Sequence, residues 1–103
     1  MAELIWGGVA ISDLECIYDY IARDSHHYAR HQIERISHSV ERLRQFPESG
    51  RRLPEFPYLP HREVLIDNYR VIYRYAADSD RVFIVTVAHG HRLLEKSSLN
   101  PVK

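Results

Sequence analysis

The stretch that most constrains the fold runs from Asp67 to Tyr75 and is typical of a turn followed by a β-strand. Asp67 and Asn68 favour the turn, because both side chains can bond to nearby backbone and Asn tolerates a positive φ. The residues after them are mainly Tyr, Val and Ile, which suit a half-buried pleated surface. Side chains alternate across a strand. One predicted face is therefore apolar and aromatic: Tyr69, Val71, Tyr73 and Tyr75. The other carries two arginines: Arg70, Ile72 and Arg74.

Two arginines on one face of a strand need an explanation. Either their charged ends reach solvent over apolar neighbours, or they form a surface that binds anions. The flanking sequence places this strand inside a sheet, so the question concerns the sheet as a whole.

The C-terminal half is predicted to form three antiparallel strands. His61–Ile66 has strand composition and is joined to the Tyr69–Tyr75 strand by the Asp67-Asn68 hairpin turn. A second turn at Ala77–Asp80 leads to a last strand over Arg81–Ala88. This last strand is apolar on both faces, and such strands are usually central in a sheet.

The N-terminal part begins with a short predicted strand, Ala2–Trp6, which Gly7-Gly8 ends. Apolar residues then recur at helical spacing up to Ile21. The first helix is expected to start between Gly8 and Ser12. Ser12 and Glu15 have the spacing of a capping box, although the apolar pattern is compatible with a start one turn earlier.

A second amphipathic helix of about 20 residues is predicted to follow, capped by Asp24 or Ser25 and stopped by Pro47. The short link between the helices predicts an antiparallel helical hairpin. Arg51–Pro60 then reads as a proline-rich loop with two aromatic residues expected to be exposed, Phe56 and Tyr58. Leu93–Lys103 is expected to be a polar tail with a short helical turn.

The predicted order is strand, helix, helix, strand, strand, strand. The economical packing is an α+β fold in which the helical hairpin covers one face of a small, mostly antiparallel sheet that the first strand joins. The length, 103 residues, suits one domain over residues 1–103.

Composition excludes several classes of function. The formal net charge is zero with seven neutral histidines, which argues against bulk electrostatic attraction to nucleic acid. The single cysteine, Cys16, excludes an internal disulfide and fits a reducing cytoplasm. Because Cys16 lies within an apolar helical pattern, a buried and inert thiol is expected. No apolar run approaches the roughly 20 residues that span a membrane, and the N-terminus does not read as a signal peptide.

The residues best suited to chemistry lie on, or just beyond, the three C-terminal strands. Arginines in this set can bind phosphate bidentately, and an imidazole beside them can act as a general acid or base. The candidates for catalysis are Arg70, His89 and Arg92, and those for binding an anion or target are Arg62, Glu63 and Arg74. The alternative is structural: each arginine pairs with a carboxylate or lies along apolar surface.

Metal binding is not expected. His27 and His31 are one helical turn apart, and His89 and His91 share a face if the strand continues through Gly90. Neither pair has a third ligand at a fitting spacing. No cofactor is expected either, since the chain has no Gly-rich phosphate loop.

At this point the chain resembles a known family nearly end to end, from Ile5-Trp6 to Arg92-Leu93. The matching pieces are Ile5-Trp6, Asp13-Leu14, Ile17, Tyr20-Ile21-Ala22, Asp24-Ser25, Leu43, Phe46-Pro47, Gly50-Arg51, Pro54-Glu55, Arg62-Glu63, Tyr69-Arg70-Val71-Ile72-Tyr73 and His89-Gly90 with Arg92. In this order they look like the RelE/ParE superfamily of toxins from type II toxin–antitoxin systems, often labelled plasmid stabilisation proteins.

The resemblance implies a growth-regulating toxin neutralised by a small antitoxin, whose C-terminal segment wraps it. RelE-like members cut mRNA in the ribosomal A site, and ParE-like members inhibit DNA gyrase without a nuclease centre. Arg70 and Arg92 match arginines that the nucleases use. Leu93 and Leu94 stand where a tyrosine would follow, and the chain is not strongly basic. Both departures favour ParE, whereas His89 keeps the nuclease alternative open.

Three hypotheses follow. The first is a ParE-like gyrase inhibitor that is not an enzyme and uses the helical hairpin as its main partner surface. The second is a ribosome-dependent mRNA endonuclease. The third is a non-toxic member that only binds its antitoxin and helps repress its own operon, with DNA contacted only indirectly through the antitoxin.

Overall fold

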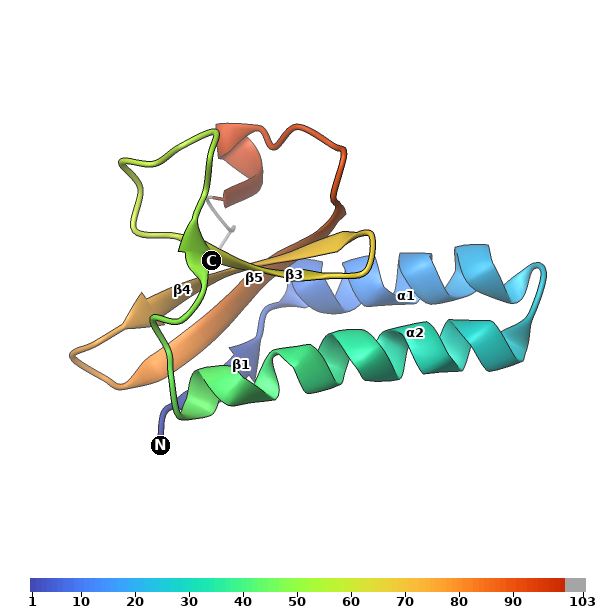
Figure 1. The fold of residues 1–103 in the computed structure, drawn as a ribbon, viewed down its shortest axis with the longest axis horizontal. Coiled ribbons are helices and arrows are strands. Elements are labelled where there is room, and N and C mark those ends of the chain that lie inside the picture. Colours follow the sequence, from blue (N-terminus) through green and yellow to red (C-terminus); the bar gives the residue numbers. More distant parts are fainter. Residues whose placement is uncertain (100–103) are drawn as a thin grey trace.

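A computed structural model describes residues 1–99 and shows two helices packed on one face of a five-stranded sheet (Figure 1). The spatial order of the strands is β1-β5-β4-β3-β2. Their bounds are β1 Glu3–Trp6, β2 Arg51–Arg52, β3 Arg62–Ile66, β4 Tyr69–Ala76 and β5 Arg81–His89. β1 pairs with β5 in parallel, and all other neighbours are antiparallel. The predicted α+β class is confirmed, and the last strand, β5, is internal as its two apolar faces indicated.

The two helices form the predicted hairpin, whose connecting turn projects beyond the sheet in Figure 1. α1 spans Gly8–Ala22 and has Gly7 as its N-cap with no side-chain cap bond, so the Ser12 spacing does not mark the start. α2 spans His26–Ser39, and the hydroxyl of Ser25 accepts a bond from the backbone N–H of Tyr28 at 3.2 Å. This is the expected helix cap.

α2 is shorter than predicted. The apolar stripe does continue through Val40 and Leu43, both fully buried. However, the backbone tightens after Ser39 into a separate 3₁₀ turn, η1, over Glu41–Arg44. The stripe therefore extends beyond the helix because the tighter turn keeps presenting apolar side chains to the core.

The sheet separates two apolar clusters, and the alternation along β4 decides which residues enter each. The helix-side core contains Val71 and Tyr73 with Ile36 of α2 and Ile84 of β5. The cluster on the opposite face, the outer cluster, is Leu53, Ile72, Ala88, Leu94 and Leu99. The outer cluster forms because the chain after β5 folds back over the sheet, ending in a second 3₁₀ turn, η2, over Lys96–Leu99. Residues 100–103 of the predicted tail lie outside the described part.

Two expectations for the proline-rich loop need correction. Its first residues, Arg51 and Arg52, form the short strand β2 against Glu63 and Arg62. Phe56 is half-buried because it packs on the outer cluster, whereas Tyr58 is exposed as expected. The loop is therefore anchored to the sheet at its start and by an apolar contact in its middle.

Cys16 is exposed, so the predicted buried thiol is wrong. The side chains of α1 that pack inward are Ala10, Leu14 and Ile17, which lie three or four residues apart. At 3.6 residues per turn, Cys16 projects well away from these three side chains. Within residues 1–99 no helix is both long enough and apolar enough to cross a membrane.

Candidate functional site

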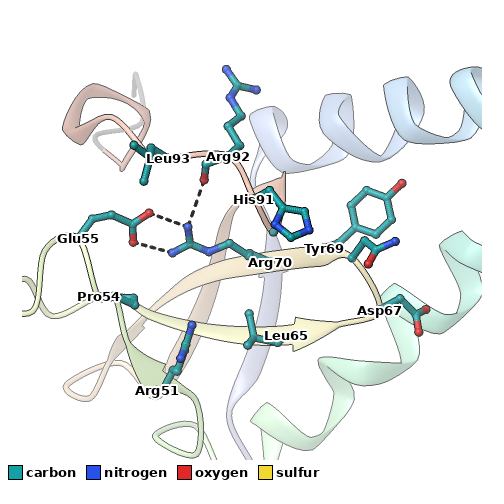
Figure 2. Close-up of a pocket in the computed structure, with 12 residues that line it drawn as sticks. Arg51, Pro54, Glu55, Leu65, Asp67, Tyr69, Arg70, His91, Arg92 and Leu93 are labelled. Atoms are coloured by element: carbon teal, nitrogen blue, oxygen red, sulfur yellow. Dashed lines mark hydrogen bonds and ion pairs between the residues drawn. The ribbon is translucent and has the colours of Figure 1, made fainter.

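Arg70 lies at the centre of an ion-pair cluster on the outer face of the sheet, and only 5% of its surface is exposed. Its Nε donates to Glu63 Oε1 at 2.7 Å. Its two terminal nitrogens donate to the two carboxylate oxygens of Glu55, at 2.6 and 2.8 Å. Figure 2 shows this bidentate pair, together with a longer bond of 3.3 Å to the backbone carbonyl of Arg92. We refer to Arg51, Glu55, Glu63 and Arg70 as the Arg70 cluster.

The elements of the fold explain why these side chains meet. β3 and β4 are antiparallel with Leu65 opposite Arg70, so Glu63 is the diagonal neighbour of Arg70 on the same face. Glu55 approaches from the proline-rich loop, which β2 anchors beside β3. Arg51, in β2, pairs with the second oxygen of Glu63.

The charges of the cluster balance, with two guanidinium groups facing two carboxylates. The side chain of Glu63 is fully buried, and that of Arg70 is 6% exposed. The hydrogen bond from Arg70 lowers the pKa of Glu55 to about 2, against the opposing effect of burial. The same bond raises the pKa of Arg70. A phosphate would therefore have to displace an ionised carboxylate to reach Arg70.

Beside the cluster lies an open depression of about 510 Å³, here called the outer cleft. Glu55 and Arg51 line one side, and His91, Arg92 and Leu93 line the other. The side chain of Arg92 is exposed and points away from the guanidinium of Arg70 in Figure 2, although its carbonyl bonds to that group. The backbone of Arg92 is thus adjacent to Arg70, but the two guanidinium groups do not face a common site.

The remaining predicted arginines do not converge on this cleft. Arg62 donates to the backbone carbonyl of Gly50 at 2.9 Å. Arg74 is exposed and lies over the ring of Phe83, with its guanidinium carbon 5.2 Å from the ring centroid. Arg62 and Arg74 therefore follow the structural alternative, one bonded to backbone and one lying on an aromatic surface.

His89 lies in a different depression of about 550 Å³, the helix-side cleft, between α1 and the end of the sheet. Its ring is 5.7 Å from that of Tyr69 and 5.4 Å from that of His91, measured between centroids. The same cleft is lined by Asp13, Cys16 and Tyr20 from α1, and by Arg92. The structure therefore brings together His89 and Arg92, but not Arg70.

Several residues of these sites were missed at the level of sequence. Glu55 and Arg51 sit in a stretch that reads as loop, and only the tertiary contact shows that they neutralise Arg70 and Glu63. Asp13 was also missed: it accepts bonds from Thr86 Oγ1 at 2.5 Å and from the backbone N–H of Val87 at 2.9 Å. Asp13 thus gives a hydrogen-bond partner to the backbone N–H of Val87, which lies on β5 beyond the last residue paired with β1.

Within the described residues 1–99, the histidine pairs gain no third ligand. Among residues 1–99 no group of three or more His, Cys, Asp or Glu side chains is arranged to hold a metal ion.

Comparison with known proteins gives a consistent family assignment. The family model described as the ParE toxin of the type II toxin–antitoxin system parDE matches residues 4–94. A curated relative, Toxin RelE2 of Caulobacter vibrioides, is 33% identical over 93 residues, which cover 90% of this chain and all of the relative.

Solved structures share the fold at lower identity. A chromosomal ParDE system from P. aeruginosa aligns with a TM-score of 0.73 and 22% identity, over 86% of this chain and 96% of that one. The isolated E. coli RelE toxin aligns with a TM-score of 0.59 and 16% identity, over 90% and 88%. The RelBE2 toxin–antitoxin complex from Mycobacterium tuberculosis gives 0.56 and 18%, over 85% and 96%.

Proposed function

Because the chain belongs to the ParE toxin family of type II toxin–antitoxin systems, within the RelE/ParE superfamily, we propose that it inhibits DNA gyrase and is neutralised by a cognate antitoxin. In this proposal the protein acts in the cytoplasm, where it would meet gyrase and where a single free cysteine such as Cys16 stays reduced. In this proposal the protein binds its target and carries out no covalent chemistry.

The observation that carries the proposal is that the guanidinium of Arg70 is fully occupied by hydrogen bonds to the carboxylates of Glu55 and Glu63. A ribonuclease that holds phosphate through this arginine needs its guanidinium free, whereas here all three of its nitrogens donate to carboxylates. The neutral net charge adds support, since a protein that enters the ribosome gains from positive charge.

The helical hairpin is the proposed partner surface. It exposes large apolar side chains along α1 and near the connecting turn, including Val9, Ile11, Tyr20 and Tyr28. An amphipathic segment of an antitoxin can bury such side chains, and aromatic residues frequently dominate the energy of protein interfaces.

A supercoiling assay tests the proposal. The toxin is purified by dissociating it from the product of the neighbouring antitoxin reading frame, refolded and added to gyrase and relaxed plasmid. Loss of supercoiling that the antitoxin restores is the expected result. Full gyrase activity in the presence of excess refolded toxin would show that the target is wrong.

A second function is supported by the helix-side cleft. His89 and Arg92 lie there together with Tyr69, a combination that could move a proton beside a bound phosphate. The 33% identity to a RelE toxin is compatible with this reading. The test is primer extension on mRNA from a translating extract. Cuts spaced by codons that disappear in His89→Ala and Arg92→Ala would establish a ribosome-dependent nuclease, and intact mRNA would exclude it.

The third hypothesis, a non-toxic partner of the antitoxin, is separated from both by expression of the chain alone in cells. Growth arrest is expected from either toxin. Normal growth with soluble, folded protein present would favour a purely regulatory member.

A further inference from the structure

We propose that the segment Leu93–Leu99, the C-terminal strap, is an acid-releasable cover on the outer face of the sheet, with His61 as its latch. This cover would act in the same way whichever target the toxin has. The burial of His61, the groups around it and the contacts that hold the strap point to it.

His61 is buried directly before β3, with 8% of its surface exposed. Its Nδ1 atom is buried and finds no hydrogen-bond partner among residues 1–99. A neutral imidazole tolerates this environment because one ring nitrogen can remain an unprotonated acceptor. A protonated imidazole carries an N–H on both nitrogens, so protonation would place an unsatisfied charged donor in the interior.

Among residues 1–99, the groups that line the cavity beside His61 offer no carboxylate to compensate such a charge. A cavity of about 370 Å³ adjoins the ring and is lined by Leu59 of the proline-rich loop and by Lys96, Ser97 and Leu99 of η2. The charged neighbours are both cations, Lys96 from η2 and Arg74 from β4. Burial, with a smaller effect of Arg74, lowers the pKa of His61, and an interaction with the backbone of Leu99 only partly opposes this.

The strap itself is held by few contacts. Leu94 and Leu99 pack into the outer cluster against Leu53, Ile72 and Ala88. The backbone N–H of Leu94 donates to Glu55 at 3.2 Å, and the bond from Ser98 N–H to Glu95 lies within the strap. The ammonium of Lys96 also lies over the ring of Tyr58, 5.5 Å from its centroid. A segment held by two apolar side chains, one backbone bond to a carboxylate and one exposed cation–π contact can open without unfolding the sheet.

The sign of the effect follows from linkage. When the strap opens, His61 becomes solvated and its pKa returns toward the ordinary value of 6.5. Below that pH the open form binds the proton more readily than the closed form, so acid shifts the population toward opening. Each unit by which the closed form lowers the pKa can raise the open population by up to about tenfold.

Opening would change the outer face of the sheet in two ways. It would uncover the buried side chains of Leu53 and Ile72, and it would withdraw the carbonyl of Arg92 from Arg70. The pair between Arg70 and Glu55 stays intact in this range, because the pKa of Glu55 is about 2. Acid thus exposes an apolar surface while leaving the Arg70 cluster closed.

The experiment is an NMR titration of the full chain from pH 8 to pH 5, following the His61 ring and the backbone amides of residues 94–99. Amide hydrogen exchange, corrected for its intrinsic pH dependence, is measured in parallel. We expect His61 to titrate below 6.5, and the protection of the strap amides to fall as the pH passes below 6.5. Helix and strand amides should keep their protection.

Two variants separate the latch from general acid sensitivity. His61→Gln cannot gain a charge and should remove the acid-dependent loss of strap protection, whereas the exposed His27→Gln should retain it. If His61→Gln does not fold by circular dichroism, His61→Phe takes its place. The proposal is overturned if the wild-type strap keeps its protection at pH 5, or if it opens equally in the folded His61 variant and in the wild type.

Discussion

The carboxylate of Glu55 accepts hydrogen bonds from both terminal nitrogens of Arg70, at 2.6 and 2.8 Å, although the two residues are 15 positions apart in the sequence. This contact ties the proline-rich loop to β4, while Glu63 ties β3 to the same guanidinium. An arginine that matches the nuclease pattern of the superfamily is therefore a structural link in this protein. Five predictions test this and related features.

The first prediction concerns removal of the arginine. Arg70→Ala leaves the fully buried carboxylate of Glu63 with only the partly exposed Arg51 as its partner. We expect a loss of about 3–5 kcal/mol in the free energy of unfolding, the usual cost of breaking a buried pair. Urea unfolding measures it. Arg74→Ala is the matched control on the same strand and face, and should cost about 1 kcal/mol or less. Equal losses of unfolding free energy in the two variants would show that the buried ion pairs of Arg70 add no stability beyond that of an exposed arginine.

The second prediction concerns acid stability. The pKa of Glu55 is about 2 in the folded protein against an ordinary 4.5, because Arg70 donates to its carboxylate. A lowered folded-state pKa means that its stabilising effect is complete above pH 4.5 and is lost as the pH falls toward 2. Glu55→Gln should therefore be less stable at pH 7 and should lose less stability between pH 4.5 and 2.5.

Urea unfolding at a series of pH values checks this second prediction. Asp67, whose pKa is also about 2 because of hydrogen bonds from Arg35 and Gln32, contributes a separate slope that both proteins share. Asp67→Asn is the control that removes that slope alone. Parallel curves for the wild type and Glu55→Gln would contradict the assignment.

The third prediction concerns a buried tyrosine hydroxyl. The backbone N–H of Gly50 donates to the hydroxyl oxygen of Tyr73 at 2.9 Å, and Tyr73 is fully buried. Tyr73→Phe leaves that N–H unsatisfied and should cost about 1–3 kcal/mol. Tyr75→Phe removes a bond to Asp80 in an exposed setting and should stay within about 0.5 kcal/mol. Thermal or urea unfolding distinguishes the two variants.

The fourth prediction tests the helix-side core. Ile36 of α2 is fully buried, whereas Ile11 of α1 is 47% exposed. Ile36→Ala should cost about 2–5 kcal/mol, through lost apolar burial and the cavity that remains. Ile11→Ala should cost much less in the free toxin. Calorimetry of the same variant with the antitoxin gives a second readout: weaker binding by Ile11→Ala would identify Ile11 as part of the partner surface.

The fifth prediction separates the two toxic activities with one substitution. His89 is exposed in the helix-side cleft, so His89→Ala should leave the fold unchanged. A gyrase inhibitor that works through the helical hairpin should retain full inhibition in the supercoiling assay. A nuclease that uses this imidazole should lose mRNA cleavage by roughly 10²-fold or more. A variant that loses gyrase inhibition would place the gyrase contact at this cleft.

Much of the architecture was predictable because it depends on local periodicity. Helical spacing located α1 and α2, and alternation along Tyr69–Tyr75 separated Val71 from Ile72 onto opposite faces of the sheet. Strand composition, with the turn residues Asp67 and Asp80, both at φ 52°, located the two hairpins of the antiparallel unit. Helical spacing, strand alternation and turn residues each depend on side chains only a few positions apart, so they can be read directly from the sequence.

The state of each charged side chain was decided only by the tertiary structure. Arg70 and Arg74 look equivalent in the sequence, four positions apart on one face of a strand. One is buried between two carboxylates, Glu55 from the proline-rich loop and Glu63 from β3, and the other lies exposed on Phe83. Whether a guanidinium is free or neutralised depends on which distant carboxylate reaches it. Local periodicity holds no information on that contact.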